Sequence, residues 1–346
     1  MLLDNFYAEV EVSAGGHEWS MGACATDCVE KVWPMTYRGN RPKQSEREFN
    51  YPAEGNYPIA VPAGGDIWDR CKEAGVTHGS YGESVENAAV VGDPGTAKAE
   101  ALVSHIDPYF RSYKLNYPDV KRVERFIEEL RGLEEKGEMP QFMIVCISDD
   151  HTAGTRNGAP TPTGIVADND LALGMVVEAI SKSRFWNKSD IFVVENDAQN
   201  GPDHADAHRA RALVVSPYTS RGVVDSSMYS TASILRTMEL ILGLRPMSQF
   251  DAAALPMYNR FTGKPDFTPY ACKPAGVDLN AKNLAGAWGL ETSHQLDLAR
   301  EDAGDDLVFN EIIWKSVKGA DSMMPAPVRA AFVFAHTDKP AADDDD

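Results

Sequence analysis

Short apolar runs alternate along this chain with longer segments in which apolar residues recur at helical spacing. Three of the runs contain no polar residue: 142–147 (FMIVCI), 191–194 (IFVV) and 212–215 (ALVV). Strands that are covered on both faces, as in a parallel sheet, show such continuous runs because neither face meets water. We therefore expect each run to be a central strand.

Helix signals lie around these runs. The spacing of apolar residues and the stop and cap residues predict helices over 66–74, from 118–119 onward, over 168–183 and over 230–242. Asp168 and Ser230 are the expected N-terminal caps of the last two, and glycines 75 and 243 are the expected stops of the first and last. Strands that alternate with helices indicate an α/β fold, here a three-layer α/β/α sandwich around a largely parallel central sheet.

The same pattern sets the expected domain organisation. Residues 1–338 are predicted to form a single domain, and 38–66, rich in Gly, Pro, Asn and charge, a surface excursion over the active site. Residues 339–346 (AADDDD at their end) are expected to be a disordered acidic tail.

Composition narrows the class of protein. With 346 residues and 43% hydrophobic content the chain can bury a large core. Its 33 Lys and Arg against 52 Asp and Glu give a net charge of −19, which argues against a nucleic-acid partner. We expect no transmembrane segment and no signal peptide at the start as given, and the compartment stays undecided.

The cysteines carry no paired CxxC spacing of the kind that binds zinc. Cys24 and Cys28 lie four residues apart, which on a helix would place both thiols on one face. Packed free thiols are favoured over a disulfide or a metal-binding pair.

Acid and imidazole groups follow two of the predicted strands. Ligands of open α/β sheets bind beyond the carboxyl ends of the strands, where these groups lie. A mixture of carboxylate and imidazole suits zinc, iron or manganese, although a solvated polar loop would show a similar composition. The first cluster is Asp149, Asp150 and His151, and the second is Asn196, Asp197, Asp203, His204, Asp206 and His208.

A candidate nucleophile lies near the N-terminus, in Ser13-Ala-Gly-Gly-His17, which we expect at the end of an apolar strand. A serine hydroxyl becomes a competent nucleophile when a base or a metal lowers the cost of its deprotonation. The motif on its own is weak because strand–Ser–Gly–Gly turns are common, and Ser20 is the fallback.

Long stretches of the chain resemble a known family. They are SDDHTAGTRNGAPTPTGIVADNDLALG and VVENDAQNGPDHADAHRARALVVSPYTSRG, supported by LLDNFY, GGHEWS and NEIIWKSVKGADSMMPAPVRAAF. They are similar to the phosphoesterase branch of the alkaline-phosphatase superfamily, which includes bacterial acid phosphatases, phospholipases C and propeller-linked members. The resemblance implies two divalent metals, with zinc first and iron, manganese or calcium as alternatives, around a Ser or Thr nucleophile.

Residue by residue, the resemblance assigns catalysis to Ser13, with His17 four residues later as in related phosphodiesterases. It assigns metal binding to Asp150, His151, Asn196, Asp197, His204 and His208. Close relatives often have Asp at position 196, and the family's upstream Asp or Glu-Asn motif does not occur before Met1, so one ligand is expected to be missing.

The predicted function is metal-dependent hydrolysis of a phosphate monoester or diester by a phosphatase, phosphodiesterase or phospholipase C-like enzyme. The alternative is a noncatalytic, degenerate binding module on the same fold. The expected partner is a small phosphorylated substrate, and a homo-oligomer is compatible with the sequence. Relatives are often periplasmic or secreted.

Overall fold

The computed structural model describes residues 1–37, 43–44, 47–48, 50–52, 57–114, 117–197, 208–298 and 303–326. Much of the predicted excursion at 38–66, the predicted ligand His204 with Asp203 and Asp206, and the tail at 339–346 therefore lie outside the described residues.

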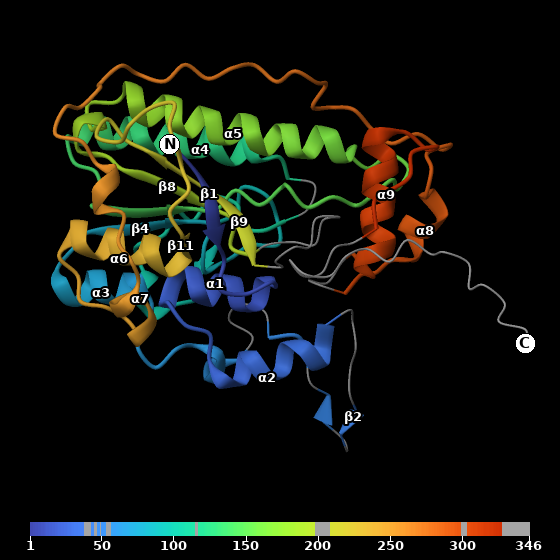
Figure 1. Ribbon diagram of the computed structural model, residues 1–346, viewed down its shortest axis with the longest axis horizontal. Coiled ribbons are helices and arrows are strands. Elements are labelled where there is room, and N and C mark those ends of the chain that lie inside the picture. Colours follow the sequence, from blue (N-terminus) through green and yellow to red (C-terminus); the bar gives the residue numbers. More distant parts are fainter. Residues whose placement is uncertain are drawn as a thin grey trace, which may run out of the picture.

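A mixed sheet lies at the centre of the molecule (Figure 1), with the strand order β10-β1-β9-β8 and with β11 also paired to β1. Two further strands, β4 (His78–Tyr81) and β7 (Phe142–Val145), pair in parallel beside it. The strands of the mixed sheet are β1 (Leu2–Tyr7), β8 (Ile191–Val194), β9 (Arg209–Val215), β10 (Val224–Asp225) and β11 (Tyr229–Ser230). Short antiparallel pairs are formed by β2 (Lys43–Gln44) with β3 (Arg47–Glu48) and by β5 (Val85–Glu86) with β6 (Thr96–Ala97).

The expectation of a largely parallel sheet is not confirmed. Strand β9 runs antiparallel to both of its neighbours, β1 and β8, whereas β10 and β11 are parallel to β1. A continuous apolar run indicates that both faces of a strand are buried, but it carries no information on the direction of the strand. The three predicted strands themselves are present as β7, β8 and β9.

Helices lie on both sides of the strands (Figure 1). Helices α4 (Asp119–Lys136) and α5 (Pro162–Lys182) lie on one side, and α1 (Ser13–Gly22), α3 (Ile67–Ala74) and α6 (Thr231–Leu242) on the other. Strand β7 shows both contacts: Met143 and Val145 pack in the cluster formed with α4 and α5, and Phe142 and Ile144 in the cluster formed with α3 and α6. The fold is therefore mixed α/β.

The remaining helices lie around this centre. Helix α2 (Asp27–Thr36) follows α1, α7 (Gln249–Ala253) follows α6, and α8 (Leu290–Gln295) and α9 (Asp306–Lys318) pack at one end of α5 (Figure 1). Short 3₁₀ helices span Pro58–Ala60, Glu100–Leu102, Trp186–Lys188 and Tyr258–Arg260. No helix within the described ranges is both long and apolar enough to cross a membrane.

Local signals set several helix ends as predicted. Helix α3 has Asp66 as its N-cap and ends at Gly75, whose φ of +70° is the left-handed conformation that glycine adopts without strain. Helix α6 likewise lies between Ser230 and Gly243. These caps act within a few residues of the chain, which is why the sequence reveals them.

Helix α5 departs from the prediction. It begins at Pro162, capped by the Thr161 hydroxyl, which accepts a hydrogen bond from the Gly164 N–H at 3.1 Å. Asp168 lies inside the helix, and its carboxylate accepts the N–H groups of Asp119 at 2.6 Å and Val120 at 3.2 Å. Asp168 therefore does cap a helix, but that helix is α4, which it reaches through tertiary packing.

None of the five cysteines, all of which lie in the described ranges, forms a disulfide. Cys24 and Cys28 do not share a helix, because α1 ends at Gly22 with Ala23 as its C-cap, and Cys28 belongs to α2.

A buried pair of carboxyl groups joins α6 to α7. Asp251 accepts the N–H groups of Met247 at 2.7 Å and Ser248 at 2.9 Å, while Glu239 receives Arg236 at 3.1 Å through Oε2. The other oxygen of Glu239, Oε1, is buried without a donor. Burial, followed by the hydrogen bond and charge of Asp251, raises the pKa of Glu239 to about 8. Glu239 therefore holds the proton of the pair.

This pair is expected to make the protein less stable as the pH rises. Folded Glu239 keeps its proton up to about pH 8, whereas an unfolded glutamate loses it near 4.5, so the folded state binds more protons across that window. The free energy of unfolding should fall between those pH values, by at most about 1.4 kcal/mol per pH unit for one group. Denaturant titrations of wild type and Glu239→Gln at pH 5, 6.5 and 8 measure this slope. An unchanged slope in the variant would contradict the assignment; Glu18→Gln tests a second glutamate whose pKa burial raises to about 8.

Candidate functional site

Ser13 is the first residue of α1 and does not lie at a strand end as predicted. Strand β1 ends at Tyr7, and Val12 is the N-cap of the helix. Ala8, Val10 and Val12 are buried while Glu9 and Glu11 are half-buried, which is the alternation of a strand. These apolar side chains are buried although residues 8–12 do not form a strand. The pattern therefore predicts burial correctly but the type of secondary structure wrongly.

The helix start brings Ser13 to the second predicted cluster. The Ser13 hydroxyl donates a hydrogen bond to Asp197 Oδ1 at 3.3 Å, although 184 positions separate the two residues. Asp197 is buried and follows the end of β8. Both residues of this contact are predicted site residues, Ser13 as the nucleophile and Asp197 as a metal ligand.

Gly16 makes this approach possible. A Cβ atom at Gly16 would lie 2.5 Å from the carbonyl oxygen of Asn196, closer than a side chain tolerates, and 3.2 Å from Cβ of Asp197, which is a tight contact. The glycine lets the first turn of α1 rest directly on the backbone of residues 196–197. Gly16 thus accommodates the protein's own backbone.

His17 has a partner that the sequence did not suggest. Its Nδ1 lies 2.9 Å from Oε1 of Glu83, which is buried just beyond the end of β4. Gly82 and Ser84 on either side have φ values of +97° and +52°. Left-handed backbone at a serine is uncommon and marks a turn under constraint. The local sequence signal for this site is the Gly-Glu-Ser segment at 82–84, which directly follows β4.

Asp119, at the start of α4, binds the backbone of the loop that carries the first predicted cluster. The fully buried Asp119 carboxylate accepts the N–H groups of Ser148 at 3.1 Å and Asp149 at 2.8 Å, and Arg122 at 2.8 Å. Burial, with the charge of Asp119, raises the pKa of Asp149 to about 7, and Asp149 Oδ1 has no hydrogen-bond partner. The loop that follows β7 is thus fixed by charge and backbone hydrogen bonds.

Asp150 and His151 lie at the surface of this loop. His151 Nδ1 lies 2.8 Å from Asp150 Oδ1 and 3.0 Å from the carbonyl oxygen of Ser148. Desolvation lowers the pKa of His151, but the hydrogen bond and charge of Asp150 outweigh it and raise the pKa above the usual value; the charge of Asp197 adds to this rise. Asp197 therefore lies within electrostatic reach of the first cluster.

Two other predicted site residues, His208 and Ser20, form hydrogen bonds that involve the backbone. His208 is exposed before β9, where its carbonyl oxygen accepts the Ala8 N–H at 2.7 Å. Ser20, the fallback nucleophile, is buried and donates to the carbonyl oxygen of His17 at 3.1 Å. Within the described ranges no group of three or more His, Cys, Asp or Glu is arranged to hold a metal ion. The donor types suit a divalent metal, but this part of the chain does not by itself complete a metal shell.

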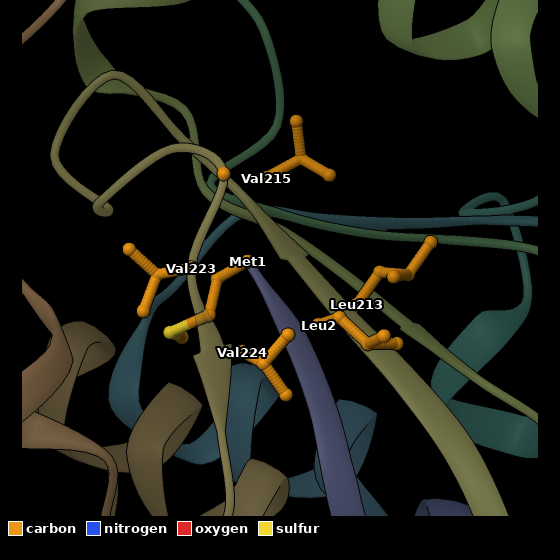
Figure 2. Close-up of a pocket in the computed structure, with 7 residues that line it drawn as sticks. Met1, Leu2, Leu213, Val215, Val223 and Val224 are labelled. Carbon is orange, nitrogen blue, oxygen red and sulfur yellow. The ribbon is translucent and has the colours of Figure 1, made fainter.

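An apolar pocket of about 340 Å³ lies at the opposite end of the sheet (Figure 2). Val215, at the end of β9, pairs with Ile191, at the start of β8, so this end is distant along the strands from Asp197. The pocket offers aliphatic side chains and no group for phosphate chemistry. Its lining residues are Met1, Leu2, Leu213, Val215, Gly222, Val223 and Val224.

The family model described as Phosphoesterase family matches residues 63–245, which is more than half of the chain. The chain belongs to the Phosphoesterase family. The matched part of the chain contains Glu83, Asp119, Asp150 and Asp197, whereas Ser13 and His17 precede it. Membership confirms the family recognised from the sequence and supports phosphoric ester hydrolysis at a general level.

A solved structure described as a protein in the alkaline phosphatase superfamily from Vibrio parahaemolyticus matches this phosphoesterase with 18% identity and a TM-score of 0.46, over 85% of this chain and 78% of that chain. No curated protein matches the chain.

Proposed function

We propose that this chain hydrolyses phosphate monoesters or diesters with Ser13 as the nucleophile. The observation that carries the proposal is the hydrogen bond from the Ser13 hydroxyl to buried Asp197, within a member of the Phosphoesterase family. His17 follows Ser13 by four residues in α1, so both side chains lie on one face of the helix. We propose that the Ser13 hydroxyl, the Asp197 carboxylate and the His17 imidazole act on one substrate.

The start of α1 suits a phosphate group. Val12 provides no side-chain cap, and the first turn contains no acidic residue. The N–H groups at a helix start carry partial positive charge and attract anions. Here the Ala14 N–H donates to the Tyr51 hydroxyl at 3.2 Å, and those of Gly15 and Gly16 donate to the Val12 carbonyl oxygen, so the attraction comes from the helix dipole and the N–H of Ser13 itself. A phosphoryl group placed there would meet Ser13, the first residue of the helix.

The reaction that we propose has two steps. Ser13 Oγ forms a bond to phosphorus while the ester O–P bond breaks, and the alcohol leaves with a proton. Water then attacks the phosphoserine, which releases phosphate, or a phosphate monoester from a diester, and restores the hydroxyl. Asp197 orients the Ser13 hydroxyl, and His17 is placed to give a proton to the leaving oxygen. Phospholipase C-like substrates fall within this class.

The proposed holders of a divalent metal, zinc first, are Asp150, His151, Asn196, Asp197, His204 and His208. A bound metal would neutralise phosphoryl charge and lower the pKa of a coordinated oxygen. Asn196 is neutral, and an aspartate at this position would bind a metal ion more strongly. We therefore propose that the metal affinity of the site is low.

Metal titration tests this proposal. Hydrolysis of 4-nitrophenyl phosphate and bis(4-nitrophenyl) phosphate should be slow in purified protein and rise as zinc or manganese is added. Asn196→Asp should reach half-maximal activity at a lower metal concentration, because affinity rises with ligand charge. Asn280→Asp, at an exposed position, is the matched control for added charge.

Two outcomes would count against this account. Full activity of wild type at trace metal would show that position 196 does not weaken the site. Absence of turnover at every metal concentration, in folded protein, would favour the noncatalytic binding module.

A further inference from the structure

Glu83 is the buried partner of His17, and no other part of the proposed reaction uses it. Its side chain is 5% exposed, while that of His17 is 29% exposed. Glu83 therefore lies against the Nδ1 edge of the imidazole, and part of the ring surface is open to solvent.

The Glu83 carboxylate stays ionised. Burial by itself raises the pKa of Glu83, but the charge and hydrogen bond of His17, the charge of Lys98 and the Cys146 thiol together hold it below the usual value. An ionised carboxylate can only accept hydrogen bonds, so His17 Nδ1 must carry the hydrogen. In the neutral ring, Nε2 is then the unprotonated nitrogen and a hydrogen-bond acceptor; in the imidazolium form it is a second donor.

The backbone holds Glu83 in place independently of His17. The carbonyl oxygen of Glu83 accepts the Ser80 hydroxyl at 2.5 Å, and the carbonyl oxygen of Ser84 accepts the Lys98 N–H at 2.8 Å. A carboxylate anchored in this way can hold an imidazole ring at one angle and in one tautomer, as the acid of a catalytic triad does.

We propose that Glu83 is a positioning residue that fixes the ring of His17 through Nδ1 and so leaves Nε2 as the atom that exchanges a proton with the substrate. This inference rests on the proposed function, in which His17 lies beside the Ser13 nucleophile. Glu83 itself does not touch the substrate. Its effect on the reaction passes through His17 alone.

A double-mutant cycle tests the coupling. Glu83→Gln should lower kcat about 10-fold to 100-fold with KM little changed, in line with the loss of groups that orient a functional histidine. The loss should be larger with phenyl phosphate than with 4-nitrophenyl phosphate, because the poorer leaving group needs the proton more. In the His17→Ala background the same change should alter kcat less than about twofold. Glu86→Gln, an exposed neighbour on β5, is the matched control.

A measurement without turnover checks the contact itself. Nitrogen-15 spectra of the histidine rings in metal-free protein, with His17 assigned by its loss in His17→Ala, should show Nδ1 protonated in wild type and a changed signal in Glu83→Gln. Glu83→Asp, which keeps the charge one methylene shorter, should recover part of kcat. If Glu83→Gln does not fold, the wild-type spectrum still tests the inference. A wild-type spectrum in which Nδ1 of His17 carries no hydrogen would overturn it.

The two proposals fail in different ways. If the fold losses in kcat caused by Glu83→Gln and His17→Ala simply multiply in the double variant, the positioning role is wrong, and the role of Ser13 as nucleophile is unaffected. Full activity of Ser13→Ala would overturn the proposed function, while the Nδ1 signal would still show whether Glu83 holds His17.

Discussion

Replacing Ser13 with alanine is expected to lower kcat for phosphate ester hydrolysis about a thousandfold or more, as the loss of a nucleophile does in other covalent mechanisms. The side chain is half-buried and its hydrogen bond to Asp197 is long, at 3.3 Å. Its removal should therefore change the melting temperature by only about a degree or two. Activity and thermal melts of the same sample, at saturating metal, measure both effects.

Ser20→Ala is the matched control, because Ser20 lies in the same helix and is the other candidate hydroxyl. Ser20 is buried and donates to the carbonyl oxygen of His17, so its loss should affect stability more than the chemical step. Activity that survives Ser13→Ala and disappears in Ser20→Ala would transfer the role of nucleophile to Ser20. Activity that survives both would assign it to water.

Asp119→Ala is expected to destabilise the fold by about 3–5 kcal/mol, the usual cost of breaking a buried ion pair. Asp119 and Arg122 both have side chains that are 0% exposed and lie 2.8 Å apart. The change also removes the acceptor for the N–H groups of Ser148 and Asp149, and buried donors left without a partner add to the cost. The free energy of unfolding, measured by denaturant titration, checks this value.

Asp27→Ala provides the contrast. Asp27 pairs with Lys31 at 2.6 Å, but both side chains are exposed, and such a pair contributes about 0–1 kcal/mol. A cost below about 1 kcal/mol for Asp119→Ala would show that the carboxylate does not support the loop after β7. If the loop is supported as we describe, activity should also fall in the fraction of Asp119→Ala that remains folded.

The sequence by itself determined features that act over a few residues. The cap Ser230 and the stops Gly75 and Gly243 lie where they were predicted, and α3 begins one residue after its predicted start, at Ile67, because caps and stops act on backbone groups only a few positions away. The apolar runs became β7, β8 and β9 because burial of a strand is visible in its own residues. The family could be recognised for the same reason, from residues that stand together in the chain.

Only the tertiary structure decided which of these local pieces meet. Asp168 caps α4, 49 positions away, Glu83 holds His17 across 66 positions, and Ser13 reaches Asp197 across 184. The direction of β9 and the close approach of Gly16 to Asn196 depend on packing in the same way. A residue type states which bonds a side chain can make, but burial and the path of the backbone decide which partner is within reach.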